Sequence, residues 1–301
     1  MKNALRVNFL LTFTLIVLGG TVRNFNAGLS CPDWPLCHGK LIPPFDLEIF
    51  LEWFHRLVAS TVGFLTLGIC VVSLYKKEYR KPFGLLSVIA LALVILQAVL
   101  GGMTVIGLLA PKWVASHLAV GLLFLLMILW MYLRLQSGLT RDRFSGGLRQ
   151  RAVGPNSPAE NLSRVRRLWI LLTFVTLLVY LQTVLGGFVS ATGAGLACPD
   201  FPTCMGQWIP PLSPLVGLQF FHRVIAFLIL FAAMGLYLVS RTLRKSSGFI
   251  LWVIGLQILL GMGNVLFKLP KPMSITHLFM ATLLVALLFD LAYKVKHAAL
   301  S

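Results

Sequence analysis

Four histidines are the residues of this 301-residue sequence best suited to chemistry, and they are His55, His117, His222 and His277. Each is expected in the first turns of an apolar helix, where an ionisable side chain is costly and usually functional. Two imidazoles from facing helices can supply both axial ligands of a haem iron that stands between the helices. The pattern therefore predicts two haem sites, one formed by His55 with His117 and one by His222 with His277.

Zinc is the main alternative ligand for these histidines. A structural zinc site needs four protein ligands, and no predicted helix offers His or Cys at positions i and i+4 to complete one. The sequence therefore favours haem iron over zinc. The two remaining histidines, His38 and His297, fall in a predicted loop and in the C-terminal tail, where we expect solvated surface.

An arginine directly follows the histidine of the second helix of each half, as Arg56 and as Arg223. Arginine at the edge of the lipid needs an anionic partner, and a haem propionate is a suitable one. The alternative is that each side chain extends to the membrane interface. We expect either cofactor binding or interfacial placement for Arg56 and Arg223.

An acidic residue distinguishes the two halves. Glu52 precedes His55 by three residues and lies near the same helix face, whereas the second half has Gln219 at that position. A carboxylate there could accept a proton or stabilise positive charge beside a haem, although an i to i+4 pair with Arg56 is the alternative. Our hypothesis is that the first half holds a haem being chemically altered, and that the second holds a permanent haem that carries electrons.

Each half also contains two cysteines separated by five residues in a predicted outer loop, Cys31 with Cys37 and Cys198 with Cys204. Zinc-binding pairs usually have shorter spacing, so we favour one disulfide within each loop. A short loop gains little closure entropy, which leaves both a structural and a redox-active role open. Cys70 is most simply a small core residue.

Composition predicts the elements that carry these residues. Hydrophobic residues make up 58% of the chain and charged residues 12%, against about a quarter charged in soluble domains. Apolar runs long enough to cross a bilayer predict an all-α integral membrane protein with eight transmembrane helices. These runs begin near Ala4, Ile49, Phe83, Trp113, Leu168, Leu215, Gly248 and Met273.

The eight runs form two copies of a four-helix unit. The second copy repeats the twin glycines, the Ala-Gly-Leu-x-Cys-Pro-Asp segment, the Pro-Pro pair and the His-Arg pair of the first at one constant offset. Because each copy has an even number of helices, we predict two tandem parallel four-helix bundles with a pseudo-twofold axis along the membrane normal. Expected boundaries are 1–137, a basic linker at 138–166, and 167–301.

The odd-numbered helices end in small residues, among them Gly19-Gly20 and Gly186-Gly187. Glycine allows close approach either by another helix or by a flat ligand. The sequence alone does not choose between helix packing and cofactor contact at these positions.

The net charge of +17 arises from 26 basic residues against 9 acidic ones, and most basic residues fall on one predicted side of the membrane. By the positive-inside rule both termini are cytoplasmic, and the charge reports topology with no role for nucleic acid. The first run lacks a cleavage site and is interpreted as a retained helix, and the absence of a transit segment favours a bacterial plasma membrane. The cysteine loops and histidines then lie toward the outer face.

The motifs closely resemble those of the haem A synthase family over nearly the whole chain except the linker. The segments that carry the resemblance are Glu-Trp-Phe-His-Arg at 52–56, the cysteine loop at 31–39 and the cysteine loop at 198–204. The resemblance implies oxidation of the C8 methyl of haem O, through an alcohol, to the formyl group of haem A for terminal oxidases. It implies that His55 and His117 face haem O, that His222 and His277 hold haem b, and that Glu52 is the acidic residue tied to catalysis.

The resemblance also implies partners. Haem O is the substrate, and the protohaem farnesyltransferase that makes it, together with oxidase assembly factors, would be protein partners in the lipid membrane. The resemblance is also compatible with a homo-oligomer. The cysteine loops match cysteine pairs of the family.

Two other functions use the same histidines. A quinone-linked dihaem cytochrome b also needs four histidines between helices, but it gives no reason for an acid in one half only. A haem transporter or chaperone would use the same ligands and release the haem unaltered.

Overall fold

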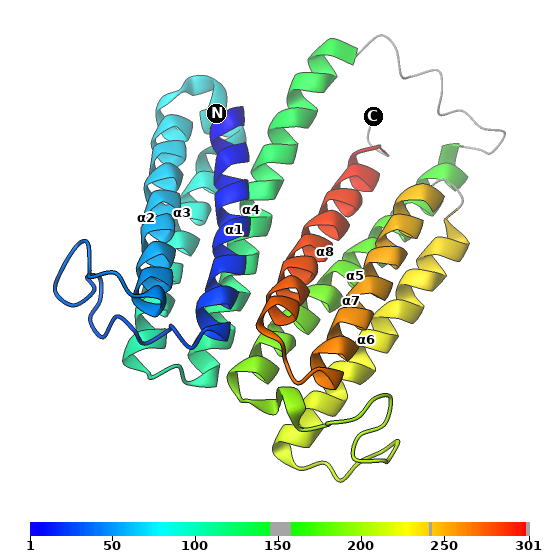
Figure 1. Cartoon of the computed structure of the whole chain (residues 1–301). Helices are drawn as coiled ribbons and strands as arrows, with labels where there is room; N and C mark the ends of the chain where they lie inside the picture. The colour runs from blue at the N-terminus through cyan, green and yellow to red at the C-terminus, as the bar shows by residue number, and fades with distance from the viewer. Residues whose placement is uncertain (145–157, 241–242, 299–301) are drawn as a thin grey trace.

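The computed structural model describes residues 1–144, 158–240 and 243–298, and within these ranges it contains eight long α-helices and no strand (Figure 1). Each helix is long and apolar enough to span a bilayer, so the prediction of eight spans is confirmed and the chain is a multi-pass membrane protein. The helices are α1 (Lys2–Asn24), α2 (Leu47–Tyr75), α3 (Lys77–Ile106), α4 (Pro111–Phe144), α5 (Pro158–Ala191), α6 (Pro214–Val239), α7 (Arg244–Leu266) and α8 (Lys271–Ala298).

Apolar side chains face outward as well as inward, as lipid requires. Phe64 of α2 is 75% exposed and Leu85 of α3 is 73% exposed. In water such side chains would destabilise the fold, whereas in hydrocarbon they cost nothing. The exposed faces of these helices are therefore lipid-facing surface.

The ends of the helices follow local chemistry. Asp46 caps α2, because its carboxylate accepts hydrogen bonds from the backbone amides of Glu48 and Ile49. Three helices, α4, α5 and α6, begin at a proline, which lacks the amide hydrogen that the first turn would leave unpaired. Both α4 and α5 extend into the predicted linker at 138–166, and the centre of that linker, 145–157, lies outside the described residues.

Within each half the four helices contact one another in a ring. Helices α1 and α3 both contact α2 and α4, and helices α5 and α7 both contact α6 and α8. Separate clusters of buried apolar side chains fill each ring, around Leu5, Val62 and Ile128 in the first and around Leu172, Leu236 and Val285 in the second. The pairs α2 with α4 and α6 with α8 therefore face each other across a ring, while the predicted symmetry axis stays a prediction.

Four helices join the halves, because α1 contacts α8, α4 contacts α5, and α4 contacts α8. Figure 1 shows α1 and α4 of the first half beside α8 and α5 of the second. Near the loop ends of α1 and α5, Arg23 donates a hydrogen bond of 3.0 Å to the backbone carbonyl of Ser190. These two positions are 167 residues apart, which makes them equivalent in the repeat.

Candidate functional site

Each of the four histidines lies against a glycine of the preceding helix. A Cβ built on Gly19 would lie 3.1 Å from Cε1 of His55, and the corresponding distances at the other three glycines are 3.0 to 3.3 Å. The pairs are Gly19 with His55, Gly101 with His117, Gly186 with His222 and Gly261 with His277. Any larger residue would press on the imidazole, so these glycines set the position of the ring.

The histidines of each pair lie on helices that face each other, on α2 and α4 for His55 and His117 and on α6 and α8 for His222 and His277. The Nδ1 atom of every one of the four is buried without a hydrogen-bond partner. Buried polar atoms normally have partners, so these rings are placed for a function that packing does not explain.

The residues of both halves fit a haem. Each site offers two imidazoles from facing helices, the donor set of a six-coordinate haem iron, and a glycine behind each imidazole. Over the described parts of the chain, no group of three or more His, Cys, Asp or Glu side chains is placed to hold a metal ion. A structural zinc ion would require such a group.

Two glutamines hold the histidine helices of the second half, and the sequence reasoning missed both. Gln182 of α5 donates a hydrogen bond of 2.6 Å to the backbone carbonyl of His222, and Gln257 of α7 donates one of 3.0 Å to that of His277. The first half has Leu15 where the second has Gln182, but it has Gln97 at the position equivalent to Gln257. A glutamine within an apolar helix was the available signal, since amides in lipid need a partner.

Glu52 is buried, at 4% exposure, and both of its carboxylate oxygens are used. One accepts a hydrogen bond of 2.6 Å from Arg56, and the other accepts one of 2.8 Å from the backbone amide of Cys31. The i to i+4 pair weighed as the alternative is thus present. The acid joins α2 to the cysteine loop, and a role toward the substrate stays a prediction.

The equivalent Gln219 of the second half is also buried but is bonded differently. Its amide nitrogen donates a hydrogen bond of 3.2 Å to the carbonyl of Gly195, and its Oε1 atom is buried without a partner. Beside the histidine of the second helix, the first half therefore has a buried acid and the second half a neutral amide.

Both arginines bind the cysteine loops. Arg56 donates hydrogen bonds to the backbone carbonyls of Cys31, Asp33 and Leu36, and Arg223 donates to the equivalent carbonyls in the second loop. The second set consists of Cys198, Asp200 and Thr203. These contacts satisfy most of each guanidinium at the membrane edge, and contact with a haem propionate stays a prediction.

Both cysteine pairs form disulfides, Cys31 with Cys37 and Cys198 with Cys204. Inside the second loop, the carboxylate of Asp200 accepts hydrogen bonds from the hydroxyl of Thr203 and from the backbone amides of Met205 and Gly206. These donors lower the pKa of Asp200 to about 2, the hydroxyl of Thr203 contributing most.

The first loop has the same internal arrangement. Asp33 accepts hydrogen bonds from the amides of His38 and Gly39, at 2.6 and 2.8 Å, and these lower its pKa, that of Gly39 most strongly. The ring of His38 is hydrogen-bonded to the carbonyl of Ser30 at 2.9 Å, so His38 is a member of the folded loop as well as an exposed residue. Each loop is therefore a compact unit built around a disulfide and an aspartate.

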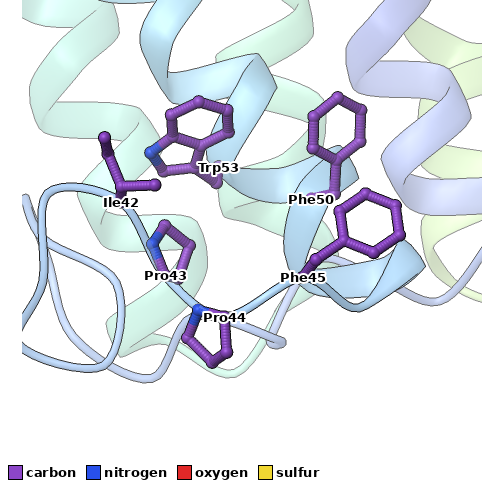
Figure 2. Close-up of a pocket in the computed structure, with 6 residues that line it drawn as sticks. All are labelled: Ile42, Pro43, Pro44, Phe45, Phe50 and Trp53. Carbon is purple, nitrogen blue, oxygen red and sulfur yellow. The ribbon is translucent and has the colours of Figure 1, made fainter.

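A hollow of about 220 Å³ lies beside the first loop, between the loop and α2. Figure 2 shows Ile42, Pro43, Pro44 and Phe45 of the loop opposite Phe50 and Trp53 of α2. The indole of Trp53 donates a hydrogen bond of 2.7 Å to the carbonyl of Leu41, which fixes the wall of the hollow. By helical spacing Phe50 and Trp53 lie on the side of α2 away from His55, so the hollow is separate from the histidine site.

Fold and site together define a multi-pass helical membrane protein with a histidine pair in each of two repeated halves. The family model for cytochrome oxidase assembly protein matches residues 2–49 and 45–289, which is most of the chain. The protein therefore belongs to the cytochrome oxidase assembly protein family.

Curated relatives agree with this assignment. The chain is 31% identical to the heme A synthase of Shewanella oneidensis, over 99% of this chain and 97% of that protein. It is 30% identical to the heme A synthase of Halalkalibacterium halodurans, over 72% and 68%. It is also 28% identical to that of Exiguobacterium sibiricum, over 94% and 92%. The resemblance seen in the motifs is confirmed.

Proposed function

We propose that this protein is an oxidoreductase that converts the C8 methyl group of haem O to a formyl group, giving haem A for terminal oxidases. Membership of the cytochrome oxidase assembly protein family and relatives named heme A synthase support the proposal. The observation that carries it is that the histidine and glycine sites occur in both halves while the buried acid, Glu52, occurs in one. A pure electron carrier has no use for that difference.

The two halves have separate tasks in this proposal. His55 and His117 hold the substrate haem O in the unit spanning 1–137, and His222 and His277 hold a resident haem b in the unit spanning 167–301, with 138–166 as the connection. The second half suits a permanent cofactor, because Gln182 fixes the backbone at His222 and the first half has Leu15 at the equivalent position. Haem b, when bound, supplies a one-electron redox centre.

The residues of the first half supply position and charge. Gly19 and Gly101 set the depth of the two imidazoles, and these orient the substrate. Conversion of a methyl to a formyl group breaks C–H bonds and is a four-electron oxidation, which needs an oxygen atom from water or O2 and an oxidant from outside this chain. Protons leave the carbon as it is oxidised, so a base is needed at the porphyrin edge. Glu52 is that base, and Arg56 holds it in place while it is charged.

The cellular setting follows from the same proposal. The protein lies in the bacterial plasma membrane with both termini in the cytoplasm, and the cysteine loops and haem sites face the outer side. Its substrate comes from the protohaem farnesyltransferase, and its product passes to oxidase assembly factors. Contact with these proteins, or with a second copy of the chain, takes place within the membrane.

Pigment analysis tests the proposal. The protein is purified from cells that make haem O, and its haems are extracted and separated by chromatography. Haem A or haem O together with haem b is expected. Haem b alone at both sites would identify a dihaem electron carrier, and haem O that is never converted during turnover would identify a transporter or chaperone.

A further inference from the structure

We infer that the second glycine of each twin pair positions a haem-ligating histidine of the opposite half, Gly20 acting on His277 and Gly187 acting on His117. The inference rests on the proposed function, because it takes these histidines as haem ligands. It adds that neither haem site is complete within its own four helices.

The contacts at Gly20 and Gly187 cross between the halves. A Cβ built on Gly20 of α1 would lie 2.3 Å from Cδ2 of Leu278 in α8, and one built on Gly187 of α5 would lie 2.5 Å from Cδ2 of Leu118 in α4. Both distances are far below a van der Waals contact, so each leucine packs directly on the glycine backbone. Each of these leucines is the residue immediately after the histidine of its helix.

The adjacent glycines act on different haem sites. Gly19 contacts His55 of its own half, whereas Gly20 contacts the neighbour of His277. The same division holds at Gly186 and Gly187 in the second half. One short stretch of α1, and one of α5, therefore touches both histidine sites.

A second contact between the same two helices fixes their relative position in each case. Phe13 of α1 packs edge-on against Phe279 of α8, with ring centroids 5.2 Å apart, and Tyr180 of α5 donates a hydrogen bond of 3.0 Å to the carbonyl of Ala119 in α4. Phe13 and Tyr180 are equivalent in the repeat, and so are Phe279 and Ala119. Because the same residue positions are used twice, the crossing is a built feature of the fold.

These contacts couple the position of a helix in one half to the position of a histidine helix in the other half. On α4 and α8 the histidine is followed by a leucine that packs on a glycine of the other half. The next residue contacts the helix that carries this glycine, Phe279 through a ring contact and Ala119 through a hydrogen bond. A shift of α1 therefore moves the segment of α8 that carries His277, and a shift of α5 moves the segment of α4 that carries His117. A bulky residue at Gly20 disturbs the haem b site although it lies in the substrate half.

Crossed substitutions test the inference. Gly20→Ala and Gly20→Leu are compared with Gly19→Ala in the full-length protein, with haem b measured as the pyridine haemochrome and haem O and haem A by chromatography. We expect haem b retention to fall in the order wild type, alanine, leucine, by about 10-fold for Gly20→Leu, the effect typical of losing a residue that orients a metal ligand. Gly19→Ala lowers the haem O and haem A content and keeps haem b. The crossed partner, Gly187→Leu, lowers haem O and haem A first.

Rescue separates positioning from misfolding. Leu278→Ala removes the atom nearest Gly20, so adding it to Gly20→Leu restores haem b if the contact is the cause. The inference is overturned if Gly20→Leu keeps wild-type haem b, or loses both haems equally and is not rescued by Leu278→Ala. Absence of haem b or haem A from the wild-type protein would instead refute the proposed function.

Discussion

The carboxylate of Glu52 accepts a hydrogen bond of 2.8 Å from the main-chain amide of Cys31, so the acid of α2 and the first disulfide loop form one unit. The second half has no acid to make this link, and Gln219 bonds to Gly195 instead. The chemistry that separates the halves is thus attached to a loop as well as to a helix.

Glu52→Gln gives the first half the amide found in the second. We expect haem A formation to slow by about 100-fold or more, because a positioned base typically contributes that much, while haem b content is unchanged. The measurement is the ratio of haem A to haem O in extracted pigment. Gln219→Glu is the matched control and leaves that ratio near the wild-type value. Full haem A production in Glu52→Gln would remove the proposed role.

Single histidine substitutions are expected to affect one half at a time. His222→Ala and His277→Ala each remove an axial ligand of haem b, so the haem b absorption of the purified protein falls several-fold. His55→Ala and His117→Ala keep that absorption and abolish haem A. Difference spectra of reduced and oxidised protein distinguish the two classes, and equal loss of haem b in all four variants would contradict the division of labour.

Arg56→Gln is expected to destabilise the protein more than Arg223→Gln. Both variants lose the same three carbonyl contacts, but only the first leaves a buried carboxylate without its cation, a loss of about 3–5 kcal/mol when a buried pair is broken. The melting temperature in detergent measures the difference. Adding Glu52→Gln to Arg56→Gln removes the stranded charge and recovers part of the loss. Equal melting temperatures for the two single variants would show that the ion pair contributes nothing.

Asp200 gives the second loop a defined pH dependence. Hydrogen bonds from Thr203 and two backbone amides lower the pKa of Asp200 to about 2 from the usual 3.8, so its contribution to loop stability is complete above the usual value. It is lost as the pH falls from there toward 2. Hydrogen exchange at the amides of Met205 and Gly206 measures this.

The control for that experiment is Asp200→Asn. The variant is expected to lower protection of both amides by about threefold to tenfold at neutral pH, the effect of losing hydrogen bonds to an exposed charge. Its protection then varies little as the pH falls from 4. Protection in the variant that equals the wild type at pH 7 would exclude the proposed role of Asp200.

Much of the fold could be predicted from the sequence, because a lipid bilayer requires long apolar helices. A bilayer-spanning helix needs an unbroken apolar run, and all eight runs became helices. The helix ends on the linker side were less predictable. There α4 and α5 continue into polar sequence that contains good helix formers and no longer has to satisfy lipid.

The histidine pairs could be found because duplication presents each of them twice. The glycine contacts could not be assigned in advance, because packing and ligand contact both favour glycine and only the rotation of each helix tells them apart. Gly19 turned out to face a histidine of its own half, and Gly20 a leucine of the other.

The contacts of the two arginines could not be predicted in full from the sequence, because most of them form only with the folded loops. Apart from Glu52, which the i to i+4 spacing to Arg56 indicated, the acceptors for Arg56 and Arg223 are backbone carbonyls. Backbone carbonyls have no signature in the sequence, and these come together only once the disulfide and the aspartate have shaped each loop. Contact of these arginines with a haem propionate stays a prediction.

The hydrogen bond from Arg23 to Ser190 joins equivalent positions of the two copies. Under any rotation that exchanges the copies, such a contact lies beside the rotation axis. Two arginines at these equivalent positions would repel each other, so the contact requires a different residue in each copy. Because both copies lie in one polypeptide, one can carry an arginine where the other carries a serine, and one can carry Glu52 where the other carries Gln219.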